Sequence, residues 1–396
     1  MAPNIAEVHG ALAAVEEPEL LRGLGELGMV RDVELGRHEV SVSLALPVAR
    51  WPGREELARR VGDSLRGLAG IEDVRVEMVA MNDDERATLL ENLANPPGGE
   101  PAPIPPRSPP HPEHRAPGAA PGPLEQGEGR PNRFLAQGSR TRVVGIASGK
   151  GGVGKSAVTV NLAVALAARG HEVGVLDADV YGYSVPKMLG VTHEPVAIDH
   201  LMVPPVVHGV RCLSMGFFVP DDQPVIWRGP MLHKALEQFL VDAYWGEPDY
   251  LLVDMPPGTG DVALSLGQYL PRAEIVVVTT PQPAAQRVAQ RAALAAKVLK
   301  LAVRGVIENM SWFTGDDGTR YELFGAGGGQ ELAESLEVPL LARIPLVRAL
   351  REGCDEGVPV RVADPSGEAA EAFDSLAEAL AKLGPARIYR SELTVR

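Results

Sequence analysis

Cysteine and long apolar runs are nearly absent from this chain of 396 residues. Only two cysteines occur, Cys212 and Cys354, so no disulfide framework can form and a reducing cytoplasm is the expected compartment. No apolar run approaches the ~20 residues that a membrane-spanning helix needs. The first residues combine neither a basic start nor a continuous apolar segment, so we expect neither a secretory signal nor a membrane partner.

Positive charge is also scarce. The chain has 38 Lys and Arg against 52 Asp and Glu, a net charge of −14, and no segment carries the basic stripe of a nucleic-acid-binding surface. Lysine is rarer still, with none before Lys150. Lys150 and Lys155 nevertheless lie close together, which indicates a site that requires a compact ammonium group rather than a guanidinium.

What is present fits a folded chain of two or three domains, with 45% hydrophobic and 23% charged residues. Prolines are concentrated in one stretch, where residues 96–131 hold 13 of the 35. A stretch so poor in apolar surface predicts an extended, mobile linker.

The residues before this linker predict one small α+β unit. Val40, Val42 and Leu44 alternate with polar residues, which is typical of a half-buried strand. A partner strand is expected at 29–35, a helix at 54–68 and a further strand at 74–79.

The residues after the linker alternate between short apolar strands and segments of helical length. This pattern predicts an α/β fold with a mostly parallel sheet that helices cover on both faces. The expected strands lie at 143–147, 172–176, 210–215, 250–253, 274–279, 303–307 and 339–344.

A glycine-rich loop joins the first of these strands to the first helix. It reads Gly149, Lys150, Gly151, Gly152, Val153, Gly154, Lys155, Ser156 and matches the phosphate-binding pattern G-x-x-x-x-G-K-[ST]. Backbone N–H groups of such a loop surround phosphate oxygens, the lysine reaches the β- and γ-phosphates, and the hydroxyl of Ser156 binds Mg²⁺. We therefore expect an ATP site at 149–156.

Acidic residues end two of the expected strands. Asp177 and Asp179 follow one strand, and Asp254 follows another after four apolar residues. Carboxylates at these ends of parallel strands point into the ligand crevice of an open α/β sheet. We expect Asp254 and Asp177 to serve a Mg²⁺ ion and Asp179 to orient the attacking water, with Gly258 and Gly260 in a switch loop near the γ-phosphate.

Beyond the general pattern, the motifs resemble one family. The lysine just after the first glycine, Lys150, defines the deviant Walker A loop, and the segments 177–182, 254–261, 280–282 and 308–311 resemble the Mrp/ApbC iron–sulfur cluster carrier ATPases. The resemblance implies a slow Mg²⁺-dependent ATPase that works as a homodimer. It further implies that Lys150 reaches the partner's nucleotide, that Asn309 contacts adenine and that a [4Fe–4S] cluster passes to apoprotein clients with the help of assembly factors.

The stretch from Pro18 to Val30 resembles the opening of the SufT-like domain of iron–sulfur assembly factors. We therefore predict a SufT-like α+β domain at 1–95, a Pro-rich flexible linker at 96–138 and a deviant Walker A P-loop ATPase domain at 139–396.

The sequence departs from the family at the cluster ligands. Many relatives carry Cys-x-x-Cys shortly after Asn-Met-Ser, whereas residues 312–320 here contain no cysteine and include two aspartates in an expected turn at 315–318. Cys212, in an expected strand, and Cys354, in an expected loop, are weak candidates for iron ligands, so the ligands stay unknown. The alternative function is an ATP-switched positioning or scaffold ATPase, similar to MinD and ParA, with no cluster of its own.

Overall fold

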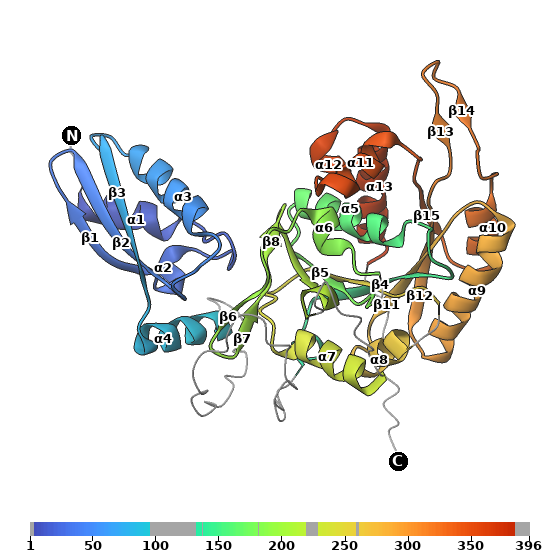
Figure 1. Ribbon diagram of the computed structural model, residues 1–396, viewed down its shortest axis with the longest axis horizontal. Helices are drawn as coiled ribbons and strands as arrows, with labels where there is room; N and C mark the ends of the chain where they lie inside the picture. The colour runs from blue at the N-terminus through green and yellow to red at the C-terminus, as the bar shows by residue number, and fades with distance from the viewer. Residues whose placement is uncertain are drawn as a thin grey trace, which may run out of the picture.

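The computed structural model describes residues 4–95, 132–136, 138–180, 182–218, 229–258 and 261–384. In Figure 1 a small α+β unit, blue, lies beside a larger α/β unit that runs from green to red. The linker expected at 96–131 lies outside the described residues.

The small unit is built around a three-stranded sheet of order β1-β2-β3, in which β2 pairs antiparallel with β1 and parallel with β3. The expected alternation is confirmed in β2, where Val40, Val42 and Leu44 are buried. Asn4 and Asn82 begin α1 and α4 with capping boxes, each closed by a glutamate three residues later. The elements are α1 (Ile5–Ala13), α2 (Leu24–Leu27), β1 (Val30–Leu35), β2 (Glu39–Leu46), α3 (Arg54–Arg66), β3 (Asp73–Ala80) and α4 (Asp83–Ala94).

The large unit contains an eight-stranded sheet of order β15-β12-β11-β4-β10-β5-β9-β8. Every neighbouring pair is parallel except β8 and β9, which are antiparallel. The central strands are buried along their whole length, as near-continuous apolar runs predict. The strands are β4 (Arg142–Ser148), β5 (Val173–Asp177), β8 (Val206–Val207), β9 (Val210–Ser214), β10 (Tyr250–Asp254), β11 (Glu274–Thr279), β12 (Ala302–Glu308) and β15 (Leu340–Arg343).

Helices cover this sheet on both faces, and each face has its own buried apolar cluster. One face carries α7 (Gly229–Val241), α8 (Asp261–Tyr269), α9 (Pro283–Val298) and α10 (Gly328–Leu336). The other carries α5 (Lys155–Ala168), α6 (Val185–Leu189), α11 (Arg348–Glu356), α12 (Val360–Ala363) and α13 (Glu368–Lys382). The predicted α/β fold with a mostly parallel, helix-covered sheet is confirmed. Among the described helices, none is long and apolar enough to cross a bilayer.

Two short hairpins extend from the large unit. One pairs β6 (Val196–Ile198) with β7 (Leu201–Val203), and the other pairs β13 (Phe313–Thr314) with β14 (Arg320–Tyr321). Ile198 and Val203 of the first hairpin join the apolar core of the small unit, together with Tyr244. The two units therefore share one buried cluster.

Just before β4, residues 133–135 form a short 3₁₀ helix, and Phe134 is buried in the core of the large unit. Asn132 donates a hydrogen bond from Nδ2 to the carbonyl of Tyr269 at 3.1 Å. Residues 132–136 thus pack on the large unit, although the sequence prediction places them in the linker at 96–138.

Candidate functional site

The phosphate-binding loop connects β4 to α5, as its sequence predicts. Gly152 and Gly154 have φ angles of +79° and +77°, a left-handed conformation that side-chain-bearing residues rarely adopt. Gly154 precedes the first turn of α5, so the unpaired N–H groups of the helix start face the loop. The loop therefore has the conformation of an anion cradle.

Gly149 also meets a steric requirement of its own. A Cβ atom there would lie 2.2 Å from the carbonyl carbon of Val288, in the backbone of α9. The first glycine is required because the loop and α9 pass so close to each other.

Asp254, at the end of β10, organises the side chains of the loop and of α5. Its Oδ2 accepts hydrogen bonds from Lys155 Nζ and Ser156 Oγ, both at 2.6 Å, and Thr159 Oγ1 donates to Oδ1 at 2.7 Å. Asp254 and Thr159 have no exposed surface. The sequence predictions for Lys155, Ser156 and Asp254 thus converge on one buried network, to which the structure adds Thr159.

Asp177 ends the neighbouring strand β5, directly beside Asp254 in the sheet register. Its Oδ1 accepts from the backbone N–H of Asp179, and its Oδ2 accepts from the hydroxyl of Ser214 and from the N–H groups of Ser184 and Val185. Burial, and then the nearby charge of Asp254, raise the pKa of Asp177 to about 7. A carboxylate oxygen has about two acceptor positions, so the three bonds saturate Oδ2, which holds the neighbouring backbone in place, while Oδ1 accepts one bond only.

Asp179 lies on the loop that follows β5, with Oδ2 3.8 Å from Lys155 Nζ. The site therefore brings three carboxylates, those of Asp177, Asp179 and Asp254, around the ammonium of Lys155. All four residues are buried, so the excess negative charge favours a further cation.

The donor set fits Mg²⁺, which prefers oxygen ligands and usually keeps water and phosphate oxygens alongside one or two carboxylates. Across the described ranges no group of three or more His, Cys, Asp or Glu side chains is arranged to hold a metal ion by itself. The oxygens of Ser156 and Asp254, 2.6 Å apart, suit an ion whose remaining ligands come with a nucleotide.

Asn309 follows β12 and contacts the loop from the other side. Its Nδ2 donates to the carbonyl of Val153 at 2.9 Å. Its Oδ1 is buried and has no hydrogen-bond partner among the described residues. A buried acceptor without a partner costs about 1–3 kcal/mol, so a ligand donor at this point would be stabilised.

The remaining predicted residues make fewer contacts with the other residues of the site. Lys150 is exposed, and its carbonyl accepts from Ser148 Oγ at 3.1 Å. Gly258 has a φ of +94° and donates its N–H to the carbonyl of Ser148, which ties the switch loop to the end of β4. Gly260 lies outside the described residues.

Two residues of the site were missed from the sequence, Thr159 and Ser214. Thr159 lies one helical turn after Lys155, a spacing that places both on one face of α5 and could have indicated its role. Ser214 ends β9, the strand beside β5, and no local pattern distinguishes it.

The two cysteines lie in different surroundings. Cys212 is buried in β9, where burial raises its pKa well above the ordinary value. The loop predicted around Cys354 is wrong, because this residue lies in α11, whose strongly one-sided apolar pattern packs it half-buried against the core. Burial raises the pKa of Cys354 too, so both residues are neutral thiols near neutral pH.

The β13–β14 hairpin, which contains no cysteine, is held by polar contacts. The expected turn is confirmed by a hydrogen bond from Gly318 N to the carbonyl of Gly315. Glu368 of α13 accepts from Trp312 Nε1, Thr314 Oγ1 and Arg320 Nη2 at 2.8–2.9 Å.

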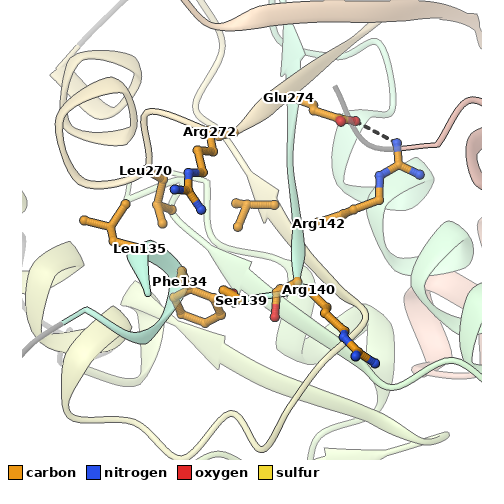
Figure 2. A pocket seen from close by; sticks show the side chains of 11 residues that line it. Phe134, Leu135, Ser139, Arg140, Arg142, Leu270, Arg272 and Glu274 are labelled. Carbon is orange, nitrogen blue, oxygen red and sulfur yellow. Dashed lines mark hydrogen bonds and ion pairs between the residues drawn. The ribbon is translucent and has the colours of Figure 1, made fainter. Parts of the chain in front are cut away.

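A separate pocket of about 290 Å³ lies at the opposite ends of the strands, where β4 and β11 begin. Figure 2 shows that Arg140 and Arg142 on its wall point away from each other, and that Arg142 pairs with Glu274. The pocket lies at the start of β4, whereas the phosphate-binding loop follows its end. The arginines of the pocket do not converge on one ligand position.

Comparison with known proteins agrees with this geometry. The family described as NUBPL iron-transfer P-loop NTPase matches residues 139–381, and the family described as iron-sulfur cluster assembly protein matches residues 5–78. An iron-sulfur cluster carrier protein of Mycobacterium tuberculosis is 42% identical over 95% of this chain and 92% of its own length. The carrier protein of the same name from Bacillus subtilis is 40% identical over 86% of this chain and 87% of its own.

Among solved structures, a nucleotide-binding protein from Archaeoglobus fulgidus in complex with ADP is 35% identical, with a TM-score of 0.51 over 59% of this chain and 93% of its own. The family models, the relatives and the loop geometry agree, and the chain belongs to the NUBPL-type iron-transfer P-loop NTPases, with an iron–sulfur cluster assembly domain at its N-terminus.

Proposed function

We propose that this protein is an iron–sulfur cluster carrier that binds ATP, hydrolyses it slowly with Mg²⁺ as a homodimer, and delivers clusters to apoprotein clients. The observation that carries the ATPase part is the network of Lys155, Ser156 and Thr159 on Asp254. Relatives named iron-sulfur cluster carrier protein, similar along nearly the whole chain, support the delivery part. They favour it over the MinD- and ParA-like positioning function.

In this proposal each residue of the site has its own role in phosphoryl transfer. Lys155 neutralises the β- and γ-phosphates, and the N–H groups from Gly151 to Gly154 bind their oxygens. Ser156 and Asp254 hold Mg²⁺, which neutralises charge on the phosphates. Asp177 supports this site through its hydrogen bonds to neighbouring residues. Asp179, 3.8 Å from Lys155, orients the attacking water.

Two further residues complete the nucleotide site in this proposal. Asn309 Oδ1, buried without a partner among the described residues, accepts from the amino group of adenine. The exposed side chain of Lys150 reaches across to the nucleotide of a second copy of the chain.

The test of the ATPase part is a pair of loop variants. Lys155→Ala should abolish hydrolysis, because it removes the charge that stabilises the transferred phosphoryl group. Lys150→Ala should retain nucleotide binding by the monomer and lose nucleotide-dependent dimerisation and turnover. Normal hydrolysis by monomeric Lys150→Ala would show that the homodimer proposal is wrong.

The cluster is the cargo of the proposed reaction, and its ligands are a separate matter. Cys212 is buried in β9 and Cys354 lies in α11, so the two do not form a ready-made ligand set, and we propose weak cluster binding or ligands borrowed from a partner protein or a small thiol. Anaerobic reconstitution, followed by iron and sulfide quantification, tests this in the wild type and in the double Cys→Ser variant. Stoichiometric, cysteine-dependent uptake by the wild type alone would contradict it.

We propose further that the chain divides into the predicted domains at 1–95 and 139–396, and that the tether occupies only the 96–131 part of the predicted linker at 96–138, because residues 132–136 pack on the large unit. The separate sheets of the two units support this division. Limited proteolysis should cut first within 96–131 and leave both units folded. Resistance throughout that stretch would contradict the tether.

A further inference from the structure

The contact between the two units is polar as well as apolar, and it centres on one buried glutamate. Glu19 of the small unit is only 6% exposed. Its Oε1 lies 3.1 Å from His193 Nε2, and its Oε2 accepts from the backbone N–H of Val206 at 2.9 Å. Both carboxylate oxygens of Glu19 are thus bound by the large unit.

Other contacts surround this one. Arg211 Nη2 donates to the carbonyl of Leu20 at 3.1 Å, and the side chain of Arg211 is buried. Arg86 pairs with Asp199 at 3.3 Å. A fixed interface, and not a chance approach, is indicated by a buried guanidinium that reaches a backbone carbonyl of the other unit.

The polar contacts described above come from one stretch of the large unit, residues 184–214, which we name the docking segment, whereas Tyr244 contacts the small unit from outside it. It runs through α6, the β6–β7 hairpin, β8 and β9. Both of its ends are bound by the same buried carboxylate at the nucleotide site. Asp177 Oδ2 accepts from Ser184 N at 3.2 Å at one end and from Ser214 Oγ at 3.0 Å at the other.

We propose that the docking segment couples the nucleotide site to the N-terminal unit, so that binding of Mg²⁺ and nucleotide tightens docking at Glu19. The inference rests on the nucleotide binding proposed above. The loop between β5 and the segment carries Asp179, which lies next to Lys155, so a nucleotide held there restricts both the loop and the start of the segment. An element that one ligand has already ordered costs less to order for a second contact, which gives the coupling a positive sign.

The Val206 amide reports docking directly, because its N–H is bonded to Glu19. In the full-length chain, its hydrogen exchange should slow at least about fivefold on addition of Mg²⁺ and ADP, the low end of typical couplings between sites. Calorimetric titration with ADP is run on the same samples. Failure to bind ADP would overturn the proposed function, whereas binding without a change at Val206 would overturn only the coupling.

Variants at Glu19 and at Ser214 test the two ends of the proposed coupling. Glu19→Gln should speed Val206 exchange and, by thermodynamic reciprocity, weaken ADP binding by the same factor that ADP slows exchange in the wild type. Exposed Glu55→Gln in the same unit is the matched control and should change neither. His193→Ala removes the same contact from the other side and replaces Glu19→Gln should that variant fail to fold.

Ser214→Ala should leave Val206 bonded to Glu19 but reduce the effect of ADP on its exchange, because one end of the segment is released from Asp177. Ser335→Ala, in α10, is the control. Unchanged ADP affinity in both Glu19→Gln and His193→Ala, with faster Val206 exchange, would show that docking is independent of the nucleotide and would overturn the proposal.

Discussion

Replacing Thr159 by valine removes one hydroxyl and keeps the size of the side chain. That hydroxyl lies 2.7 Å from Asp254 Oδ1, on the side of the carboxylate opposite to the contacts of Lys155 and Ser156. Asp254 has no exposed surface, so water cannot take the place of the lost donor. The variant therefore leaves one oxygen of a buried charge unpaired.

The expected cost follows from the charge of the acceptor. A hydrogen bond to a charged group contributes about 1.5–3 kcal/mol. In a unit of this size, ~1 kcal/mol shifts the melting temperature by about 2–4 °C, so Thr159→Val should melt roughly 3–12 °C below the wild type. Differential scanning calorimetry without nucleotide measures this shift.

Thr159→Ser is the matched control, because it keeps the hydroxyl and loses only a methyl group. Its melting temperature should stay close to that of the wild type. Equal losses in both variants would show that methyl packing matters and the hydrogen bond does not. A wild-type melting temperature for Thr159→Val would refute the reasoning altogether.

Three further perturbations test other parts of the molecule. Burial raises the pKa of Glu17 from 4.5 to about 7, so its contribution to stability is present below about pH 4.5 and is lost as pH rises through about 7, a change of roughly 3 kcal/mol. Urea unfolding at several pH values should show a flatter profile for Glu17→Gln, and an unchanged profile would contradict the assignment. Gly149→Ala should lower the melting temperature strongly because its Cβ meets the backbone of Val288, whereas Gly151→Ala, with open space around its Cβ, should not; equal melting would refute the close approach. Glu368→Gln should speed amide exchange in the β13–β14 hairpin, which loses the charge that holds it; unchanged exchange would mean that other contacts hold the hairpin.

The sequence predicted those parts of the fold in which the local residue pattern reflects which side chains are buried. Alternation in β2 and apolar runs in β5 and β10 follow directly from which faces are buried, and their positions were correct to within one or two residues. The phosphate-binding loop was recognisable because its chemistry lies in eight consecutive residues. In α11, by contrast, Gly353 and Cys354 suggested a loop, although apolar residues at helical spacing packed the segment as a helix.

Contacts between residues far apart in the sequence could not be predicted from local patterns. Glu19 and His193 are 174 positions apart, and neither stands in a pattern that would distinguish it from a solvated side chain. Ser214 is similar, since only the strand order, with β9 beside β5, brings it to Asp177. Sheet order is decided by crossovers and by packing of the whole unit, so residues that meet across strands cannot be paired from local spacing.

Asp177 illustrates what geometry adds to a motif. By sequence it is one of two aspartates at a strand end, equally suited to bind a cation. In the structure the oxygens of Asp177 accept four hydrogen bonds from protein donors, three of them at Oδ2, whereas Asp254 accepts three, one of them from the hydroxyl of Ser156. A bond between Mg²⁺ and Oδ2 of Asp177 would displace one of those donors and could release an end of the docking segment, whereas Oδ1 accepts only the N–H of Asp179. Through Oδ2 the same carboxylate therefore holds the surroundings of the nucleotide site in place, which is why the docking segment and the site respond to each other in our proposal.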